Sequence, residues 1–156
     1  MVDEISETSE QPTRGRRIMA LDLGEKRIGI ALSDETHLIA RSYAVIDRTS
    51  RQADYEQIRS IVRQEDVGFL VVGLPLNFDD EEGALGRWIR DYTAELAGKL
   101  ELDYTFWDET FTTKKASASM SARGTRAREQ KEWIDAVAAA FILQDYLDAR
   151  RRSQAL

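Results

Sequence analysis

The order in which strand patterns and helix patterns follow one another constrains the fold of this chain more than any other feature. Three strand patterns come first, and helices and strands alternate after them. Strands are expected at 17–23, 28–32, 38–46, 69–72 and 102–107, and helices at 51–65, 83–100, 112–122 and 131–150. A hairpin followed by such alternation is typical of an α/β fold, here a mixed central sheet with its first three strands antiparallel and helices flanking it.

The first apolar run, RIMALDL, carries an acidic residue where a strand is expected to be buried. Its fully apolar flanks place this strand in the middle of the sheet. A carboxylate buried there without a partner costs several kcal/mol or stays protonated. A metal ion or a nearby cation would remove the penalty at Asp22. The alternative is that Asp22 only caps the turn before Gly24.

Polar residues also follow two other expected strands. Asp108 and Glu109 come after LDYTFW, and acidic residues at strand ends of α/β sheets often line the active crevice. The segment 73–77, GLPLN, places a rigid turn after the strand FLVV, and its Asn77 could offer an amide to a phosphate or a sugar. Ordinary loop and turn chemistry is the alternative in both places.

The last expected helix places one acidic residue on an apolar face. Asp135 shares its helical face with Ala138, Ala139 and Ile142. Small residues allow a close approach to the sheet, so this carboxylate is expected to lie beside Asp22. The alternative is an exposed ion pair with Lys131, four residues earlier.

The composition decides which metal chemistry is open to these acids. The chain has no cysteine and one histidine, so a metal would sit on oxygen ligands, which favours magnesium, manganese or calcium. Carboxylates from two strand ends and one helix could hold two divalent cations about 4 Å apart and hydrolyse a phosphodiester. The absence of cysteine, of an apolar membrane span and of a signal peptide predicts a cytoplasmic protein.

The net charge of −6 is unevenly distributed along the chain. Residues 1–13 supply four acidic groups, and 1–15 are expected to form a disordered tail before a single domain over 16–150 and a short tail over 151–156. Residues 114–131 hold six basic groups against one acid. A solvated loop is one interpretation, and a surface for a polyanion is the other. The residues expected to contact nucleic acid are Lys26, Arg27, Asn77, Lys114, Arg123, Arg126, Arg128 and Lys131.

Four motifs in this order resemble those of the YqgF (RuvX) family. They are Asp22–Ala31 with Ser33-Asp34, then Gly73–Asn77, then Asp108–Thr113, and finally Lys131 with Asp135, Ala136, Ala138 and Ala139. The resemblance runs from about residue 17 to residue 148. It implies a ribonuclease H-like fold related to Holliday junction resolvases. It also implies a nuclease that trims the 5′ end of pre-16S ribosomal RNA.

The resemblance assigns the metal-binding and catalytic acids to Asp22, Glu109 and Asp135, with Asp108 as a further candidate ligand. It implies Mg²⁺ or Mn²⁺ as cofactor. It implies a nucleic-acid partner, with pre-rRNA favoured over branched DNA, no membrane, and a monomer or homodimer. One position departs from the family, because Thr110 stands where an arginine usually follows Asp-Glu. Either Arg123 or Lys131 replaces that cation, or activity is weaker.

Three other functions are compatible with parts of the pattern. A Holliday junction resolvase would use the same acids on branched DNA. A non-catalytic assembly factor would keep the fold, and Thr110 favours it. An actin-like or sugar-kinase ATPase also has an Asp-x-Gly hairpin, but its two lobes need more than 156 residues.

Overall fold

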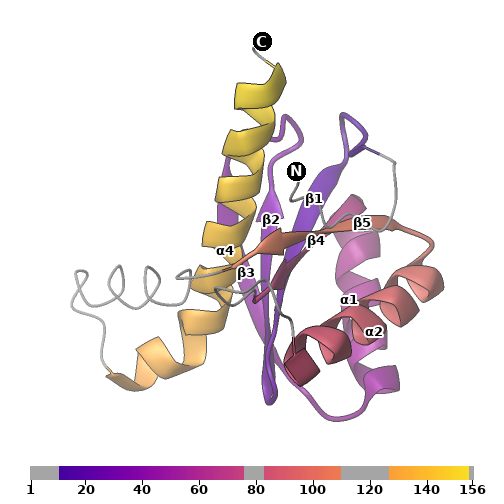
Figure 1. Ribbon diagram of the computed structural model, residues 1–156, viewed down its shortest axis with the longest axis vertical. Helices are drawn as coiled ribbons and strands as arrows, with labels where there is room; N and C mark the ends of the chain where they lie inside the picture. The colour runs from indigo at the N-terminus through magenta and orange to yellow at the C-terminus, as the bar shows by residue number, and fades with distance from the viewer. Residues whose placement is uncertain (1–10, 76–82, 110–126, 155–156) are drawn as a thin grey trace.

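A five-stranded mixed sheet in the strand order β3-β2-β1-β4-β5 organises the computed structural model (Figure 1). The structure describes residues 11–75, 83–109 and 127–154, with side chains from 133 onward in the last range. Strands β1 to β3 are antiparallel, and β4 and β5 run parallel to β1. The strands are β1 Arg17–Leu23, β2 Arg27–Ser33, β3 Ala40–Asp47, β4 Val67–Leu74 and β5 Asp103–Asp108. The helices are α1 Arg51–Gln64, α2 Gly83–Leu100 and α4 Ala127–Gln154.

Helices cover both faces of the sheet. Helices α1 and α2 pack on one face over a core that includes Leu21, Ile30 and Leu70. Helix α4 packs on the other face, where Ala20, Ala31 and Val71 belong to a second core. Side chains alternate between the faces along a strand, so β1 sends Ile18, Ala20 and Asp22 toward α4.

Helix α1 begins and ends on ordinary capping chemistry. Ser50 is its N-cap, and the Ser50 hydroxyl accepts a hydrogen bond from the Ala53 N–H at 3.1 Å. Tyr55, Ile58 and Val62 form its buried stripe. Asp66 then adopts a left-handed conformation with φ 53°, which turns the chain into β4.

Small residues let the backbone of α4 come into contact with the sheet. Strand β2 has Gly29 under the helix, where an added Cβ would lie 1.9 Å from the Asp135 carbonyl oxygen. On the helix side, Ala136, Ala138 and Ala139 are buried. The helix backbone therefore rests directly on the sheet at this point, and no other residue type fits at position 29 without movement.

Most of the expected elements are confirmed, with shifted ends. Strand β1 spans the expected 17–23 and lies in the middle of the sheet, and α2 spans the expected 83–100. Strand β4 is longer than expected, because β1 and β5 extend its hydrogen bonding to both sides. The helix expected at 112–122 lies outside the described residues.

Part of each expected tail lies within the described residues. Residues 1–10 lie outside the described residues, but Pro12 is buried and the Arg16 N–H donates to the Thr13 carbonyl at 3.3 Å. Helix α4 continues to Gln154, so 151–154 belong to a helix rather than to a tail. Within the described ranges, no helix is both long and apolar enough to span a membrane.

Replacement of Gly29 by alanine is expected to destabilise the fold. The new Cβ would overlap the α4 backbone, so we expect the free energy of unfolding to fall by about 2 kcal/mol or more. Gly98→Ala is the matched control, because nothing lies within 4 Å of a Cβ there. In the interior of α2 that change should stabilise by about 0.5–1 kcal/mol. Chemical denaturation measures both, and equal effects of the two substitutions would contradict the close contact.

Candidate active site

Asp22 lies at the end of the central strand, on the face covered by α4. It is paired with Gly29 across the β1–β2 ladder, and its neighbours Leu21 and Leu23 point into the opposite core. Only 9% of Asp22 is exposed. The sequence prediction of a buried acid in the middle of the sheet is therefore confirmed.

Glu109 reaches the same place from the end of β5. Its N–H donates to the Leu74 carbonyl at 3.3 Å, which continues the parallel pairing of β4 with β5. Gly73 leaves room for the Glu109 side chain, since a Cβ there would lie 3.3 Å from the Glu109 carboxyl carbon. The carboxyl groups of Glu109 and Asp22 are joined by a hydrogen bond. Two acids that are 87 positions apart in the chain are thus in direct contact.

Asp135 approaches the other two acids from helix α4. Its backbone lies on Gly29, and Gly29 is the ladder partner of Asp22. Its carboxylate, however, accepts a hydrogen bond from the Arg27 Nε at 3.1 Å. The side chain is 24% exposed, so this acid lies at the rim of the site rather than in its buried part.

The three carboxylates repel one another electrostatically. Burial raises the pKa of Asp22 well above its ordinary value, and the charges of Glu109 and Asp135 raise it further. Burial also raises the pKa of Glu109, and the charges of Asp108 and Asp135 add to this. The hydrogen bond between Asp22 and Glu109 raises the pKa of Asp22 and opposes the rise at Glu109. The directions of these shifts favour a proton on Asp22 that is shared with Glu109 through their hydrogen bond.

The oxygen atoms of these acids suit a hard divalent cation. A buried carboxylate pair that needs a shared proton offers oxygen ligands whose repulsion a cation would relieve. Among the described residues, however, no group of three such side chains stands close enough to hold one ion together. The physical reason is the contact with Arg27, which holds the third carboxylate at the rim.

The other expected site residues lie in different parts of the structure, and some lie outside the described residues. Asp108 is the exposed last residue of β5. Lys26 is exposed in the β1–β2 turn, and Arg27 pairs with Asp135. Asn77, Lys114, Arg123 and Arg126 lie outside the described residues, as does Thr110. Arg128 and Lys131 belong to α4, but their side chains are not described.

The structure adds a buried ion pair that sequence reasoning missed. Asp54 is fully buried in α1 and accepts hydrogen bonds from Arg48 at 3.3 Å and from the Tyr92 hydroxyl at 3.0 Å. Arg48 also donates to the carbonyls of Gly24 and Glu25, in the turn that follows Asp22. These hydrogen bonds hold the β1–β2 turn against helices α1 and α2. The available signal was weak, because Asp54 reads as a normal acid in the first turn of a helix.

A second missed residue is an exposed aromatic on the helix that carries Asp135. Trp133 is 45% exposed, two positions before Asp135. A large exposed aromatic offers a flat surface on which a nucleobase can stack. In the sequence it reads as one more apolar member of a long helix.

Comparisons with known proteins give a family and a fold. The family model described as "RuvX: Holliday junction resolvase" matches residues 16–149. A protein of Anaeromyxobacter sp. (strain Fw109-5) is 42% identical over 134 residues, which cover 86% of this chain and 98% of that protein. A protein of Thermoanaerobacter pseudethanolicus is 37% identical over 136 residues, with the same coverage. Both are named as candidate pre-16S rRNA nucleases.

Two solved structures share the fold at low sequence identity. Thermus thermophilus RuvC in complex with a Holliday junction has a TM-score of 0.55 at 15% identity, covering 87% of this chain and 96% of RuvC. Fowlpox virus resolvase bound to Holliday junction DNA has a TM-score of 0.54 at 12% identity, covering 86% and 98%. The mixed sheet with its helices is therefore the ribonuclease H-like fold that the sequence predicted.

Replacing the protonated acid should change how stability depends on pH. An acid with a raised pKa in the folded state binds its proton more tightly there than in the unfolded chain. The free energy of unfolding therefore falls as pH rises from about 4 through the raised pKa. Asp22→Asn removes this loss. The free energy of unfolding of the variant, relative to that of the parent, should therefore increase toward neutral pH by about 1.4 kcal/mol for each unit by which the pKa is raised.

Denaturation at pH values from 4 to 8 in the presence of chelator measures this effect. Asp91→Asn is the control, because Asp91 is an exposed carboxylate on α2, which covers the other face of the sheet. Its stability should follow the parent at every pH. Parallel curves for Asp22→Asn and the parent would contradict the raised pKa.

Proposed function

This chain belongs to the RuvX family, and from that premise we propose that it is a metal-dependent endonuclease acting on precursor 16S ribosomal RNA. The proposed reaction is hydrolysis of a phosphodiester bond near the 5′ end of the mature RNA. The observation that carries this proposal is the direct contact of Asp22 with Glu109, which lie at the ends of β1 and β5 on either side of β4. Phosphodiester hydrolysis on oxygen ligands needs neither cysteine nor histidine, which agrees with this composition.

Asp22 and Glu109 are the proposed principal ligands of Mg²⁺ or Mn²⁺, with Asp135 as the third acid and Asp108 as a further candidate. A divalent cation at this place would neutralise phosphate charge and make a water molecule more acidic. The proton shared by Asp22 and Glu109 must leave before both oxygens can act as ligands. Metal affinity should therefore rise with pH.

Basic and aromatic groups around the acids are the proposed contacts for the RNA strand. Arg27 is 35% exposed beside Asp135, so its guanidinium can meet a phosphate while it orients that carboxylate. Lys26 is exposed in the turn held by Arg48. Trp133 supplies a stacking surface for a base. The basic residues of 114–131 remain proposed phosphate contacts on sequence grounds.

A Holliday junction resolvase is the second candidate function. The description of the matching family model favours it. It would use the same acids, and the substrate alone separates the two activities. A non-catalytic assembly factor would bind RNA without cutting it.

The decisive experiment compares a precursor 16S rRNA fragment with a four-way DNA junction. Each is incubated with the full chain and with magnesium, manganese or chelator. We expect cleavage of the RNA with either metal and none with chelator. Cleavage of the junction alone would support the resolvase, and binding without cleavage under all conditions would support the assembly factor.

Substitution of the two contacting acids should abolish cleavage and spare binding. Asp22→Asn and Glu109→Gln keep the shape of each side chain but remove the charge that would hold a cation. We expect single-turnover cleavage to fall on the order of a thousandfold or more, with RNA affinity in chelator unchanged. Asp91→Asn should cleave at the parent rate. An Asp22→Asn variant as active as the parent would remove Asp22 from the metal site.

A further inference from the structure

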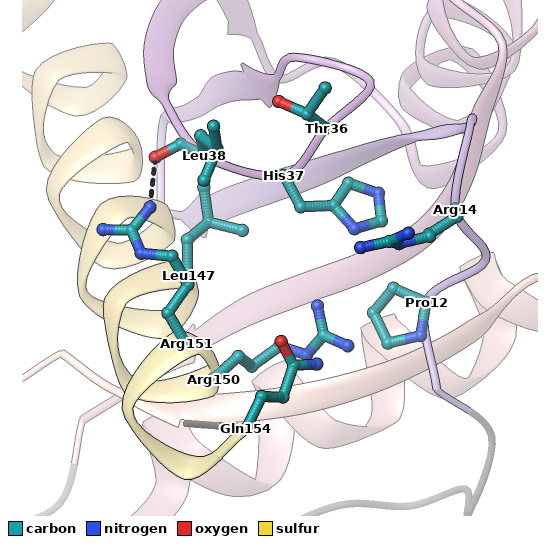
Figure 2. A pocket seen from close by; sticks show the side chains of 9 residues that line it. All are labelled: Pro12, Arg14, Thr36, His37, Leu38, Leu147, Arg150, Arg151 and Gln154. Atoms are coloured by element: carbon teal, nitrogen blue, oxygen red, sulfur yellow. Dashed lines mark hydrogen bonds between the residues drawn. The ribbon is translucent and has the colours of Figure 1, made fainter. Parts of the chain in front are cut away.

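A cavity of about 360 Å³ lies at the end of the sheet away from the acids (Figure 2). Its walls come from residues just before β1, from the β2–β3 connection and from the last turns of α4. Asp22 and Asp135, in contrast, lie near the end of β1 and in the first half of α4. The cavity is therefore separate from the candidate active site.

The lining of this cavity is basic. Figure 2 shows the guanidinium groups of Arg14 and Arg150 reaching into it from opposite sides. Neither arginine forms an ion pair in the part of the chain that the structure describes. None of the described residues that line the cavity is acidic. Two arginines without a carboxylate partner that face one space attract an anion.

Two further groups are held rigidly at the wall. Arg151 donates to the Leu38 carbonyl at 2.9 Å and pairs with Asp148. His37 is 7% exposed, and its Nε2 donates to the Arg16 carbonyl at 2.7 Å. Its backbone is left-handed at φ 61°, a conformation that a non-glycine residue keeps only where its neighbours hold it. The wall is preorganised before any ligand arrives.

Stabilisation of the helix end does not account for this arrangement. Basic residues in the last turn of a helix interact favourably with its dipole, which explains Arg151. Arg14 and His37 belong to other segments and have no such role. Their convergence on the same space needs a different cause.

We propose that this cavity binds the phosphate group of a nucleotide. The forked donors of Arg14 and Arg150 suit phosphate oxygens. Leu38, which is 48% exposed, provides apolar surface for the attached ring system, and the volume falls within the range of small-molecule sites. The nucleotide can be free or can be one unit of an RNA strand. The proposal does not depend on nuclease activity.

Titration of the full chain in chelator tests this site. The ligands are inorganic phosphate, adenosine 5′-monophosphate and a short single-stranded RNA, and the readouts are calorimetry and the NMR signal of the ring of His37, the one histidine of the chain. We expect the mononucleotide to shift that signal. The double variant Arg14→Gln, Arg150→Gln should weaken its binding about a hundredfold, roughly tenfold for each charged contact.

Arg152→Gln is the matched control, because Arg152 is exposed in the same last turn and does not line the cavity. It should bind like the parent. If only the RNA binds, and the double variant weakens it, the phosphate belongs to a strand; if the mononucleotide also binds, the site accepts a free ligand. The proposal fails if no ligand moves the His37 signal, or if Arg152→Gln weakens binding as much as the double variant. A double variant that melts at the same temperature as the parent has lost binding and not folding. If the double variant does not fold, the single variant Arg14→Gln is used in its place.

Discussion

The backbone contact between α4 and Gly29 is the constraint on which the rest of the structure depends. It fixes how closely the helix can lie on the sheet, and it does so at the residue that pairs with Asp22. Because α4 carries Asp135 at that same point, helix packing and assembly of the acids are one event. A bulkier residue at position 29 would lift the helix and separate the third carboxylate from the other two.

Close packing also brings an electrostatic cost, and the structure meets it in three ways. Asp22 shares a proton with Glu109, Arg27 neutralises Asp135, and Asp108 stays exposed at the edge. On the opposite face of the sheet, Asp54 is fully buried and is satisfied by Arg48 and Tyr92. The two buried acids thus differ in kind. Asp54 has its cation within the protein, whereas among the described residues Asp22 has another carboxylate as its side-chain partner.

Local patterns were sufficient to predict most of the fold and the burial of Asp22, whereas the choice of Glu109 over Asp108 came from the family resemblance. Alternation placed Ile28, Ile30 and Leu32 on one face, and the apolar flanks of Asp22 placed its strand in the middle. The contact between Arg27 and Asp135 could not be predicted, because it joins residues 108 positions apart through helix packing. The role of Arg48 could not be predicted either, because its partners are two backbone carbonyls and an acid on another element. Sequence periodicity reports which face is buried, but not which polar groups meet across it.

Helix α4 links the two ends of the molecule. Its first half carries Asp135 over the acidic site, and its last turns carry Arg150 over the basic cavity. Seven residues from Ala136 to Leu147 are buried against the sheet between these ends. A helix packed this tightly cannot tilt at one end without strain at the other. The contact of the α4 backbone with Gly29 lies at Asp135 itself, so packing on the sheet fixes the position of this carboxylate.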